Sequence, residues 1–267
     1  MIRDITIGQY YPADSPLHKL DPRTKLMGTL IFIISVFLFH TIPGYAVATL
    51  FLAAVIKISK VPVKFIFKGL KAIFLILLIT MLFNVFLTPG QVIWSFGFLK
   101  ITGEGISLAV KMAIRLIYLV IGSSLMTLTT TPNQLTDGLE RGLRPLNRLH
   151  VPVHEISMMM SIALRFIPIL LEETDKIMKA QIARGADFEN GNLIQKVKNM
   201  VPLLVPLFIS AFRRANDLAM AMEARCYHGG DDRTQMKPLR YDKRDHIAYL
   251  LLALYLAVAI GFRVVGI

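Results

Sequence analysis

Long runs of apolar residues, separated by short polar segments, constrain the fold of this chain more than any other feature. A transmembrane helix needs about 20 mostly apolar residues, and basic residues at the ends of a shorter run can extend it. The chain is 54% hydrophobic with a mean hydropathy of +0.56, above the range of soluble domains. We therefore predict an all-α integral membrane protein with about five transmembrane helices, over the runs Leu26–Thr41, Tyr45–Ile58, Ala72–Thr88, Gly105–Thr130 and Ile247–Val265.

The distribution of lysine and arginine predicts which side of the membrane each loop faces, because short cytoplasmic loops carry an excess of both. The amino-terminal segment and the linker over residues 57–71 are basic, whereas the turn at Thr41 has no Lys or Arg and the loop after Pro89 has only Lys100. We expect the amino terminus in the cytoplasm and the carboxyl terminus outside. The net charge of +12 lies mostly in such flanking segments, so the expected partner is the lipid bilayer and not nucleic acid.

Between the fourth and the last apolar run lies a region that is too polar to cross a bilayer as a whole and too apolar to be a loop. Its second apolar run, Val201–Phe212, is short of a span and contains two prolines. We interpret the region as long, crossed amphipathic helices at the cytoplasmic surface. The predicted organisation is a cytoplasmic segment over 1–25, four transmembrane helices over 26–131, the coupling region over 132–245 and a final transmembrane helix over 246–267.

Two segments of this region are similar, and each ends in alanine followed by arginine. The first ends in Ala183, Arg184 and Gly185, and the second ends 41 positions later in Ala224, Arg225 and Cys226. The helix dipole favours an arginine at a carboxyl terminus, which alone would explain one of them. Because the pattern recurs, we infer a further role: a guanidinium between small neighbours can enter a partner's groove and pair with a carboxylate through two hydrogen bonds. A partner with twofold symmetry would need two such arginines.

Charges of opposite sign lie at matching positions of the two segments. Glu172 and Glu173 occupy the positions that Arg213 and Arg214 have 41 residues later. If the two helices cross, these charges could pin the crossing point, and we state this as a hypothesis.

Two features leave alternatives open. Arg115 lies ten residues into the fourth apolar run, or about 15 Å along a helix, where a charge needs a partner. It either locks two helices together or reaches out to the membrane surface. The stretch Ser157–Ser161 contains three consecutive methionines, which form either an adaptable docking surface or ordinary core packing.

A membrane enzyme and a conventional ABC permease that lines its own pathway are the competing classes. His150 and His154 are four apart, but Pro152 between them disfavours a helical metal pair. The single cysteine excludes an intramolecular disulfide, and no Gly-x-x-x-x-Gly-Lys motif for ATP is present. A permease with a single coupling loop does not predict two arginine-ended helices. We therefore expect no catalytic residue and no metal site.

The chain resembles the transmembrane T component of energy-coupling factor (ECF) transporters, which are ABC-type uptake systems for vitamins and metal ions. The resemblance rests on the paired motifs at residues 183–185 and 224–226, the second with cysteine in place of the family's glycine. It also rests on Gly8-Gln9-Tyr10 and on the stretch from Leu20 to Leu26 in the entry segment.

This resemblance implies a non-catalytic scaffold subunit in the plasma membrane of a prokaryote. By carry-over, the two arginine motifs contact two ATPase subunits, which hold the ATP and Mg²⁺, while the chain itself binds no cofactor. One or more substrate-binding S components would dock on the apolar faces of the coupling helices and choose the substrate. The candidate contacts with an S component are Met158, Met159, Met160, Ile162, Leu203, Leu204 and Leu207.

Overall fold

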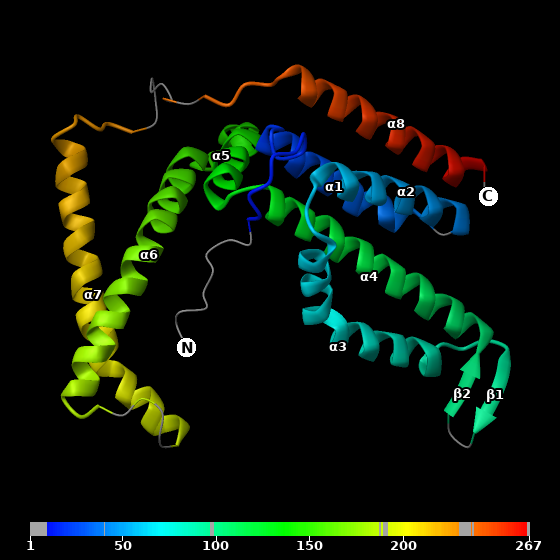
Figure 1. Ribbon diagram of the computed structural model, residues 1–267, viewed down its shortest axis with the longest axis horizontal. Coiled ribbons are helices and arrows are strands. Elements are labelled where there is room, and N and C mark those ends of the chain that lie inside the picture. Colours follow the sequence, from blue (N-terminus) through cyan, green and yellow to red (C-terminus); the bar gives the residue numbers. More distant parts are fainter. Residues whose placement is uncertain are drawn as a thin grey trace. The chain divides into compact units, whose positions relative to one another are not determined.

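The computed structural model describes residues 10–39, 41–96, 99–186, 188, 192–229, 236 and 238–265, and most of them are helical. The predicted class, an all-helical membrane protein, is confirmed. Figure 1 shows the elements in order along the chain: α1 (Pro22–Leu38), α2 (Ile42–Ser59), α3 (Val63–Leu87), β1 (Val92–Phe96), β2 (Leu99–Thr102), α4 (Gly103–Thr129), α5 (Pro132–Leu143), the 3₁₀ helix η2 (Arg144–Leu149), α6 (Val153–Ala183), α7 (Leu193–Glu223) and α8 (Lys243–Val265).

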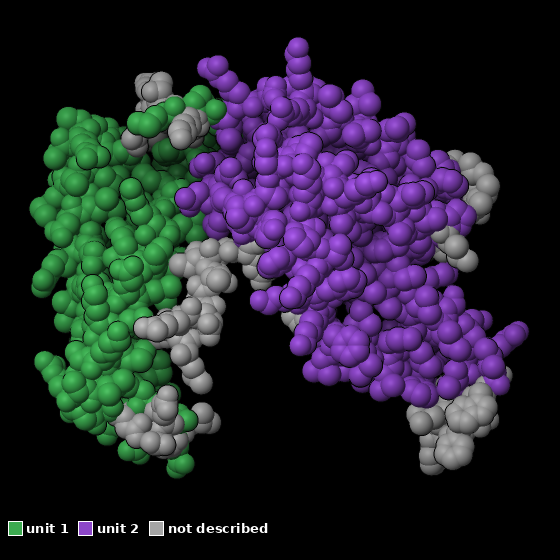
Figure 2. All heavy atoms as spheres, viewed as in Figure 1, with its two compact units in different colours: residues 1–7, 139–238 green, residues 8–138, 239–267 purple. Residues whose placement is uncertain are grey.

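The chain divides into two compact units, which Figure 2 colours separately. Unit 1 contains residues 139–238 and is built from η2, α6 and α7. Unit 2 contains residues 8–138 and 239–267, so α8 packs with α1, α2 and α4 although it is far from them in sequence. Helix α5 straddles the boundary at residue 139.

Three of the described helices, α4, α6 and α8, are long and apolar enough to cross a membrane. Helix α3 adds a fourth if its parts Val63–Lys71 and Ile73–Leu87 form one span, since they meet at a bend of 57°. Helix α2 is a shorter apolar helix, and α1 has 17 residues. Helix α6 also qualifies because it continues unbroken for 31 residues through Arg165 and Pro168. The sequence analysis had placed this helix at the membrane surface.

A two-stranded antiparallel hairpin, β1–β2, lies between α3 and α4, where the sequence analysis expected a loop. The strands are rich in Val, Ile, Trp and Phe, which favour extended backbone, and this propensity was not weighed. Thr102 ends the hairpin and caps α4. Its Oγ1 accepts a hydrogen bond of 3.1 Å from the amide of Gly105 and donates one of 2.9 Å to the carbonyl of Thr88.

The core of unit 2 lies where α1, α2, α4 and α8 meet. Val36 of α1 and Ala48 of α2 are fully buried, and the ring of Tyr255 in α8 stacks on Phe51 with centroids 4.3 Å apart. The Tyr255 hydroxyl is paired at 2.7 Å with Oγ of Ser35, so the buried polar groups satisfy each other. This packing fixes the last helix against the first two.

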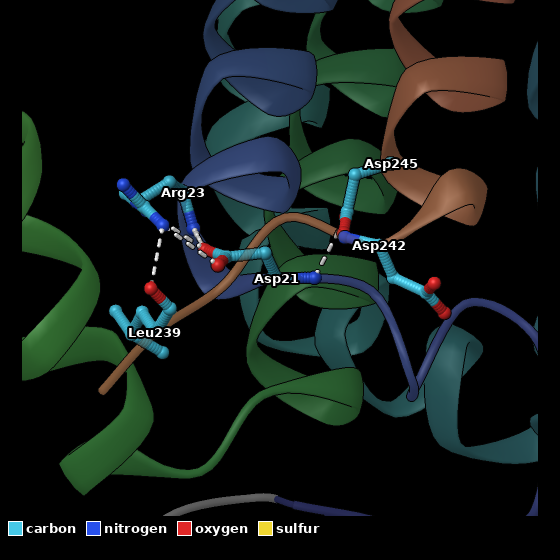
Figure 3. Close-up of polar contacts among 5 residues, drawn as sticks. All are labelled: Asp21, Arg23, Leu239, Asp242 and Asp245. Atoms are coloured by element: carbon cyan, nitrogen blue, oxygen red, sulfur yellow. Dashed lines mark hydrogen bonds and ion pairs between the residues drawn. The ribbon is translucent and has the colours of Figure 1, made fainter. Parts of the chain in front are cut away.

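A polar cluster joins the starts of α1 and α8 (Figure 3). Asp245, 1% exposed, accepts a hydrogen bond from the amide of Asp21 through Oδ1 and another from the amide of Asp242 through Oδ2, both at 2.9 Å. Asp242 precedes α8 and Asp245 is three residues later, which is the arrangement of a capping box. Asp21 is the N-cap of α1, so the same carboxylate also serves the first turn of another helix.

Arg23 closes this cluster on its other side. Its Nε and Nη2 donate to the two carboxylate oxygens of Asp21 at 3.1 and 3.0 Å, and Nη2 lies 3.4 Å from the carbonyl oxygen of Leu239. The guanidinium also lies over the ring of Tyr241, 4.1 Å from its centroid. The segment that leads into α8 is therefore tied to the start of α1.

Lys25, just ahead of the first apolar run, is buried beside these carboxylates. Its Nζ donates to the carbonyl oxygens of His18 and Thr129 at 3.0 and 2.8 Å. Burial lowers the pKa of Lys25 to about 8, and the charges of Asp245 and Asp21 oppose this shift.

Arg115 of α4 contacts the end of α1. Its Nη2 donates to the carbonyl oxygen of Phe39 at 3.3 Å, and its guanidinium lies 5.1 Å from the centre of the Phe37 ring. Phe39 caps α1 at the end where helix carbonyls lack internal partners. Of the two alternatives for Arg115, the structure has the contact between helices.

Candidate docking site on the long helix pair

Unit 1 is built around two helices of equal length, α6 and α7, which run in opposite directions and cross (Figure 1). Each has 31 residues, or about 46 Å at 1.5 Å per residue. Gln181 near the end of α6 contacts Pro202 early in α7, and Glu173 contacts Arg214 later in α7, so the contacts run antiparallel. The predicted pair of long crossed helices is confirmed.

Glu173 and Arg214 hold the crossing together. Arg214 donates to Oε2 of Glu173 from Nη2 at 3.0 Å and from Nε at 3.3 Å, and Oγ of Ser210 donates to Oε1 at 2.5 Å. Both charged side chains are partly exposed, so this ion pair contributes at most about 1 kcal/mol. Glu172 and Arg213, the other two residues of the charge hypothesis, are exposed and form no ion pair with the rest of the described chain.

The ion pair joins matching positions of the two helices, 41 residues apart. Arg184 is 11 positions beyond Glu173, and Arg225 is 11 positions beyond Arg214. The two arginines therefore lie about 16 Å along their helices from this ion pair, in opposite directions.

Helix α6 ends in a cap that turns the chain off the helix axis immediately. Gly185 has a positive φ of 88°, which glycine adopts without steric cost. The amide of Ala186 donates to the carbonyl of Gln181, and the amide of Gly185 to that of Ile182, both at 2.9 Å. These two bonds define a Schellman motif in which Arg184 is the capping residue.

Helix α7 ends in the same motif with cysteine in the place of glycine. Cys226 has a φ of 54°. The amide of Tyr227 donates to the carbonyl of Met222 at 3.0 Å, and the amide of Cys226 to that of Glu223 at 2.8 Å. Arg225 thus has the same place as Arg184. The substitution preserves the cap, although a left-handed residue with a side chain costs about 1–2 kcal/mol.

Both arginines are open to solvent at these ends. The six residues of the two motifs, Ala183, Arg184, Gly185, Ala224, Arg225 and Cys226, are all exposed. Neither the Arg184 nor the Arg225 side chain has a hydrogen bond or ion pair with another residue that the structure describes. Each end of the helix pair therefore presents a guanidinium with its donors unused.

A second tie between the helices depends on the prolines of α7. In an unbroken helix the carbonyl of residue 202 would accept from the amide of residue 206, but Pro206 has no N–H. Gln181 of α6 takes this place, since its Nε2 donates to the carbonyl oxygen of Pro202 at 3.2 Å. In the sequence, the two prolines argue against a membrane-spanning helix, and in the structure they also create a contact between α6 and α7. Their spacing of four was the signal for a carbonyl that needs an outside donor.

The residues predicted to contact an S component differ in exposure. Met159, Met160 and Leu204 are 58%, 45% and 40% exposed. Met158, Ile162 and Leu207 are half-buried. Leu203 is 8% exposed, which corrects its prediction as a surface contact: its side chain is packed within this protein.

A longer apolar stripe on α7 was not predicted. Its side chains follow at steps of three and four, so they lie along one side of the helix. Each is at least 40% exposed: Ile194, Val197, Val201, Leu204, Val205, Phe208 and Phe212. This spacing is present in the sequence, and it extends beyond the two short apolar stretches that were predicted to contact an S component.

A polar contact that sequence reasoning missed joins the end of α5 to the start of α6. Oε1 of Glu140 lies 3.1 Å from Nδ1 of His154. Oε2 of the same carboxylate accepts a hydrogen bond of 2.9 Å from Oγ of Ser157. His154 is therefore paired with a carboxylate. Over the described ranges, no three His, Cys, Asp or Glu side chains are placed to hold a metal ion together.

The fold defines a helical membrane protein with a pair of long helices, each of which ends in an exposed arginine motif. The model of the cobalt transport protein family (CbiQ) matches residues 13–237 of the chain. Proteins named energy-coupling factor transporter transmembrane protein EcfT are similar over nearly the full length. The one from Clostridium kluyveri is 55% identical over 99% of this chain and 98% of its own. The one from Ruminiclostridium cellulolyticum is 60% identical over 92% of each chain, and the one from Bacillus subtilis is 46% identical over 98% of this chain and 100% of its own.

The chain belongs to the EcfT family, the transmembrane proteins of energy-coupling factor transporters. The resemblance stated from the paired arginine motifs is thereby confirmed at the level of the family. A membrane location agrees with the apolar helices.

Proposed function

We propose that this chain couples two ATPase subunits to a substrate-binding S component in an ECF-type importer. The observation that carries the proposal is a pair of exposed arginines, on caps of the same type, that have no partner among the described residues and end the two helices of one crossed pair. Two similar sites on one pair of helices suit two similar partners. The partners would bind the ATP and Mg²⁺, and this chain would carry the motion.

Each arginine would insert into a groove of one ATPase subunit. A guanidinium offers parallel N–H donors that match a carboxylate, and it stays charged when water is excluded. The Schellman caps place Arg184 and Arg225 at the last turn of each helix, where the chain departs. When ATP binding draws the two subunits together, each would displace the helix end that it holds.

The helix pair would transmit this displacement through its crossing. The Glu173–Arg214 ion pair and the Gln181–Pro202 hydrogen bond connect α6 and α7. Because of these contacts, movement at one helix end would change the angle between the two helices. An S component would sense the change through the apolar stripe of α7 and through Met159 and Met160. Flexible methionines suit a surface that accepts several different S components in turn.

In this arrangement unit 1 faces the cytoplasm, where ATP is available, and the amino terminus lies on the same side with the carboxyl terminus outside. The name of the matching family mentions cobalt, and the resemblance covers vitamins and metal ions. The S component would select among these micronutrients. A conventional permease lining its own pathway is the alternative. It requires polar residues facing a channel within unit 2, whereas the buried polar side chains of Ser35 and Asp245 there are paired, the first with Tyr255 and the second with two backbone amides.

Replacing both arginines tests the proposal. We expect Arg184→Ala with Arg225→Ala to leave the protein in the membrane but to release the ATPase subunits on purification from the native host. Truncating one side of a desolvated charge contact costs about 2–5 kcal/mol, a loss of affinity of at least about 30-fold. The matched control is Lys196→Ala with Lys198→Ala, which removes two exposed charges elsewhere on α7.

Full retention of the ATPase subunits by the double arginine variant would contradict the proposal. If the native protein purifies alone and turns over a substrate, the chain is an enzyme. If it purifies with ATPases but imports substrate without any small membrane partner, it is a conventional permease.

A further inference from the structure

The segment between α5 and α6 is basic on one side and apolar on the other, and we call residues 141–149 the elbow. Arg141, Arg144 and Arg148 border one surface depression together with Pro145 and Asn147. Arg144 and Arg148 are exposed, and neither has a hydrogen bond or ion pair to any residue within the described parts of the chain. At least two guanidinium groups at this depression thus lack a counter-charge.

The carboxylate next to the elbow in sequence is engaged elsewhere. Glu140 directly precedes the elbow, but its two oxygens lie at 3.1 Å from Nδ1 of His154 and 2.9 Å from Oγ of Ser157. No Asp or Glu occurs from residue 141 to residue 154. A depression lined by like charges raises the local concentration of anions. Glu140 precedes the elbow, and His154 and Ser157 follow it, so these contacts join the two ends of the elbow.

The apolar side of the elbow consists of leucines that are spaced by three residues, as in the 3₁₀ helix η2. Leu143, Leu146 and Leu149 follow at intervals of three, and the 3₁₀ helix η2 has three residues per turn, so they share one side. They are 42%, 37% and 74% exposed. Exposed leucines beside arginines are typical of a segment that lies in the interface between a membrane and water.

The place of the elbow in the chain points the same way. Helix α4 is long and apolar enough to cross a bilayer, and it ends at Thr129. Arg141, the first residue of the elbow, is 12 positions later in the chain, so the elbow closely follows a helix that can cross the membrane. We infer that the elbow binds the phosphate groups of anionic phospholipids, with Arg144 and Arg148 on the phosphates and Leu146 and Leu149 in the adjoining acyl layer. This site does not depend on the partner contacts proposed above.

A fluorescent reporter on the elbow of the full-length protein tests this site. Cys226→Gly removes the single native thiol, and Leu149→Cys then accepts an environment-sensitive dye. The protein is placed in nanodiscs of phosphatidylcholine with increasing amounts of phosphatidylglycerol, using lipids with brominated acyl chains as quenchers. We expect the emission to shift to the blue and to be quenched as phosphatidylglycerol rises.

Arg144→Gln with Arg148→Gln should weaken this response about 30-fold, since each basic residue contributes about fivefold at an anionic surface. Arg144→Lys with Arg148→Lys should retain most of it, because the attraction depends mainly on charge. The matched control Lys196→Gln with Lys198→Gln should leave the titration unchanged.

Equal quenching in phosphatidylcholine alone, or an unaltered titration in the double glutamine variant, would overturn the inference. A response to inorganic phosphate in phosphatidylcholine nanodiscs would reassign the site to a soluble anion. A response that needs added ATPase subunits would reassign it to an acidic protein surface. Elution volume and thermal unfolding of each variant report whether it has folded, so a misfolded variant is recognised.

Discussion

In the proposed assembly, two single residues decide where the ATPase subunits bind. Arg184 and Arg225 each precede a left-handed residue, and the chain leaves the helix axis directly after them. Gly185 adopts this conformation without strain, whereas Cys226 carries a side chain there. The second cap therefore holds the same geometry at a higher conformational cost.

This difference predicts opposite effects at the two caps. Cys226→Gly should stabilise unit 1 by about 1 kcal/mol because it removes the left-handed strain. Gly185→Ala, the matched change at the other cap, should destabilise it by a similar amount. For a chain of this size the melting temperature should move by about 2–4 °C in each direction. Thermal unfolding in detergent measures both, and shifts of the same sign would contradict the account.

At this scale the sequence predicted local motifs well and distant partners poorly. The arginine ends were predictable because helix, arginine and glycine are neighbours in the chain. The double role of Asp245 was not, because its second partner, Asp21, is 224 positions away. The tie from Glu140 to Ser157 also crosses a break between helices, where no periodicity indicates which side chains will meet. Leu203 was misplaced because an apolar run does not indicate which of its residues face inward.

Among the helices, α1 and α8 depend on each other through one carboxylate. Asp245 satisfies an amide at the start of each helix, although the two helices come from opposite ends of the chain. A cap of this kind contributes about 1 kcal/mol per helix, and more when the amides are buried.

Asp245→Ala should therefore destabilise unit 2 by about 2–4 kcal/mol, since the buried amide of Asp21 and the partly buried amide of Asp242 lose their acceptor and Lys25 loses a counter-charge. Asp242→Ala is the control, because its exposed side chain accepts from the amide of Lys243 and lies 3.9 Å from Nε of Arg244, and both partners belong to α8. Hydrogen exchange should accelerate at the starts of both α1 and α8 in the first variant and only at α8 in the second. Faster exchange confined to α8 in Asp245→Ala would show that α1 does not need this acceptor.

The lengths of the helices were predictable from the apolar runs, but their ends and bends were not. Helix α3 starts at Val63, ahead of its apolar run at Ala72, and the helical spacing of Lys64, Lys68 and Lys71 indicates this longer start. Its bend near residue 72 and the β1–β2 hairpin have no signal in hydropathy alone. Both depend on backbone preferences that a count of apolar residues does not record.

For the molecule as a whole, the proposed function requires that the two long helices move as a pair. The Glu173–Arg214 contact lies at their crossing, so its charges are the natural place to test that requirement. The contact is partly exposed and weak in stability terms, and its effect should appear in coupling more than in folding.

Glu173→Arg or Arg214→Glu alone should reduce the ATP-dependent uptake of the assembled transporter, because each places like charges at the crossing. The two changes together restore an opposite pair and should recover much of the loss. Arg213→Glu is the matched control, since Arg213 is exposed and has no described partner. Uptake and co-purification are measured in parallel, and full activity of both single variants would remove the pair from the mechanism.

The positions of the two arginines have a mechanical consequence in the proposed assembly. Arg184 and Arg225 lie in opposite directions from the Glu173–Arg214 pair, so two subunits that closed on both arginines together would rotate the helices about this contact. A load on one arginine alone would instead shift the whole pair. The helix pair would thus respond differently to the closure of both ATPase subunits and to the motion of one. Only closure of both would change the angle between α6 and α7, and the S component would respond to that angle.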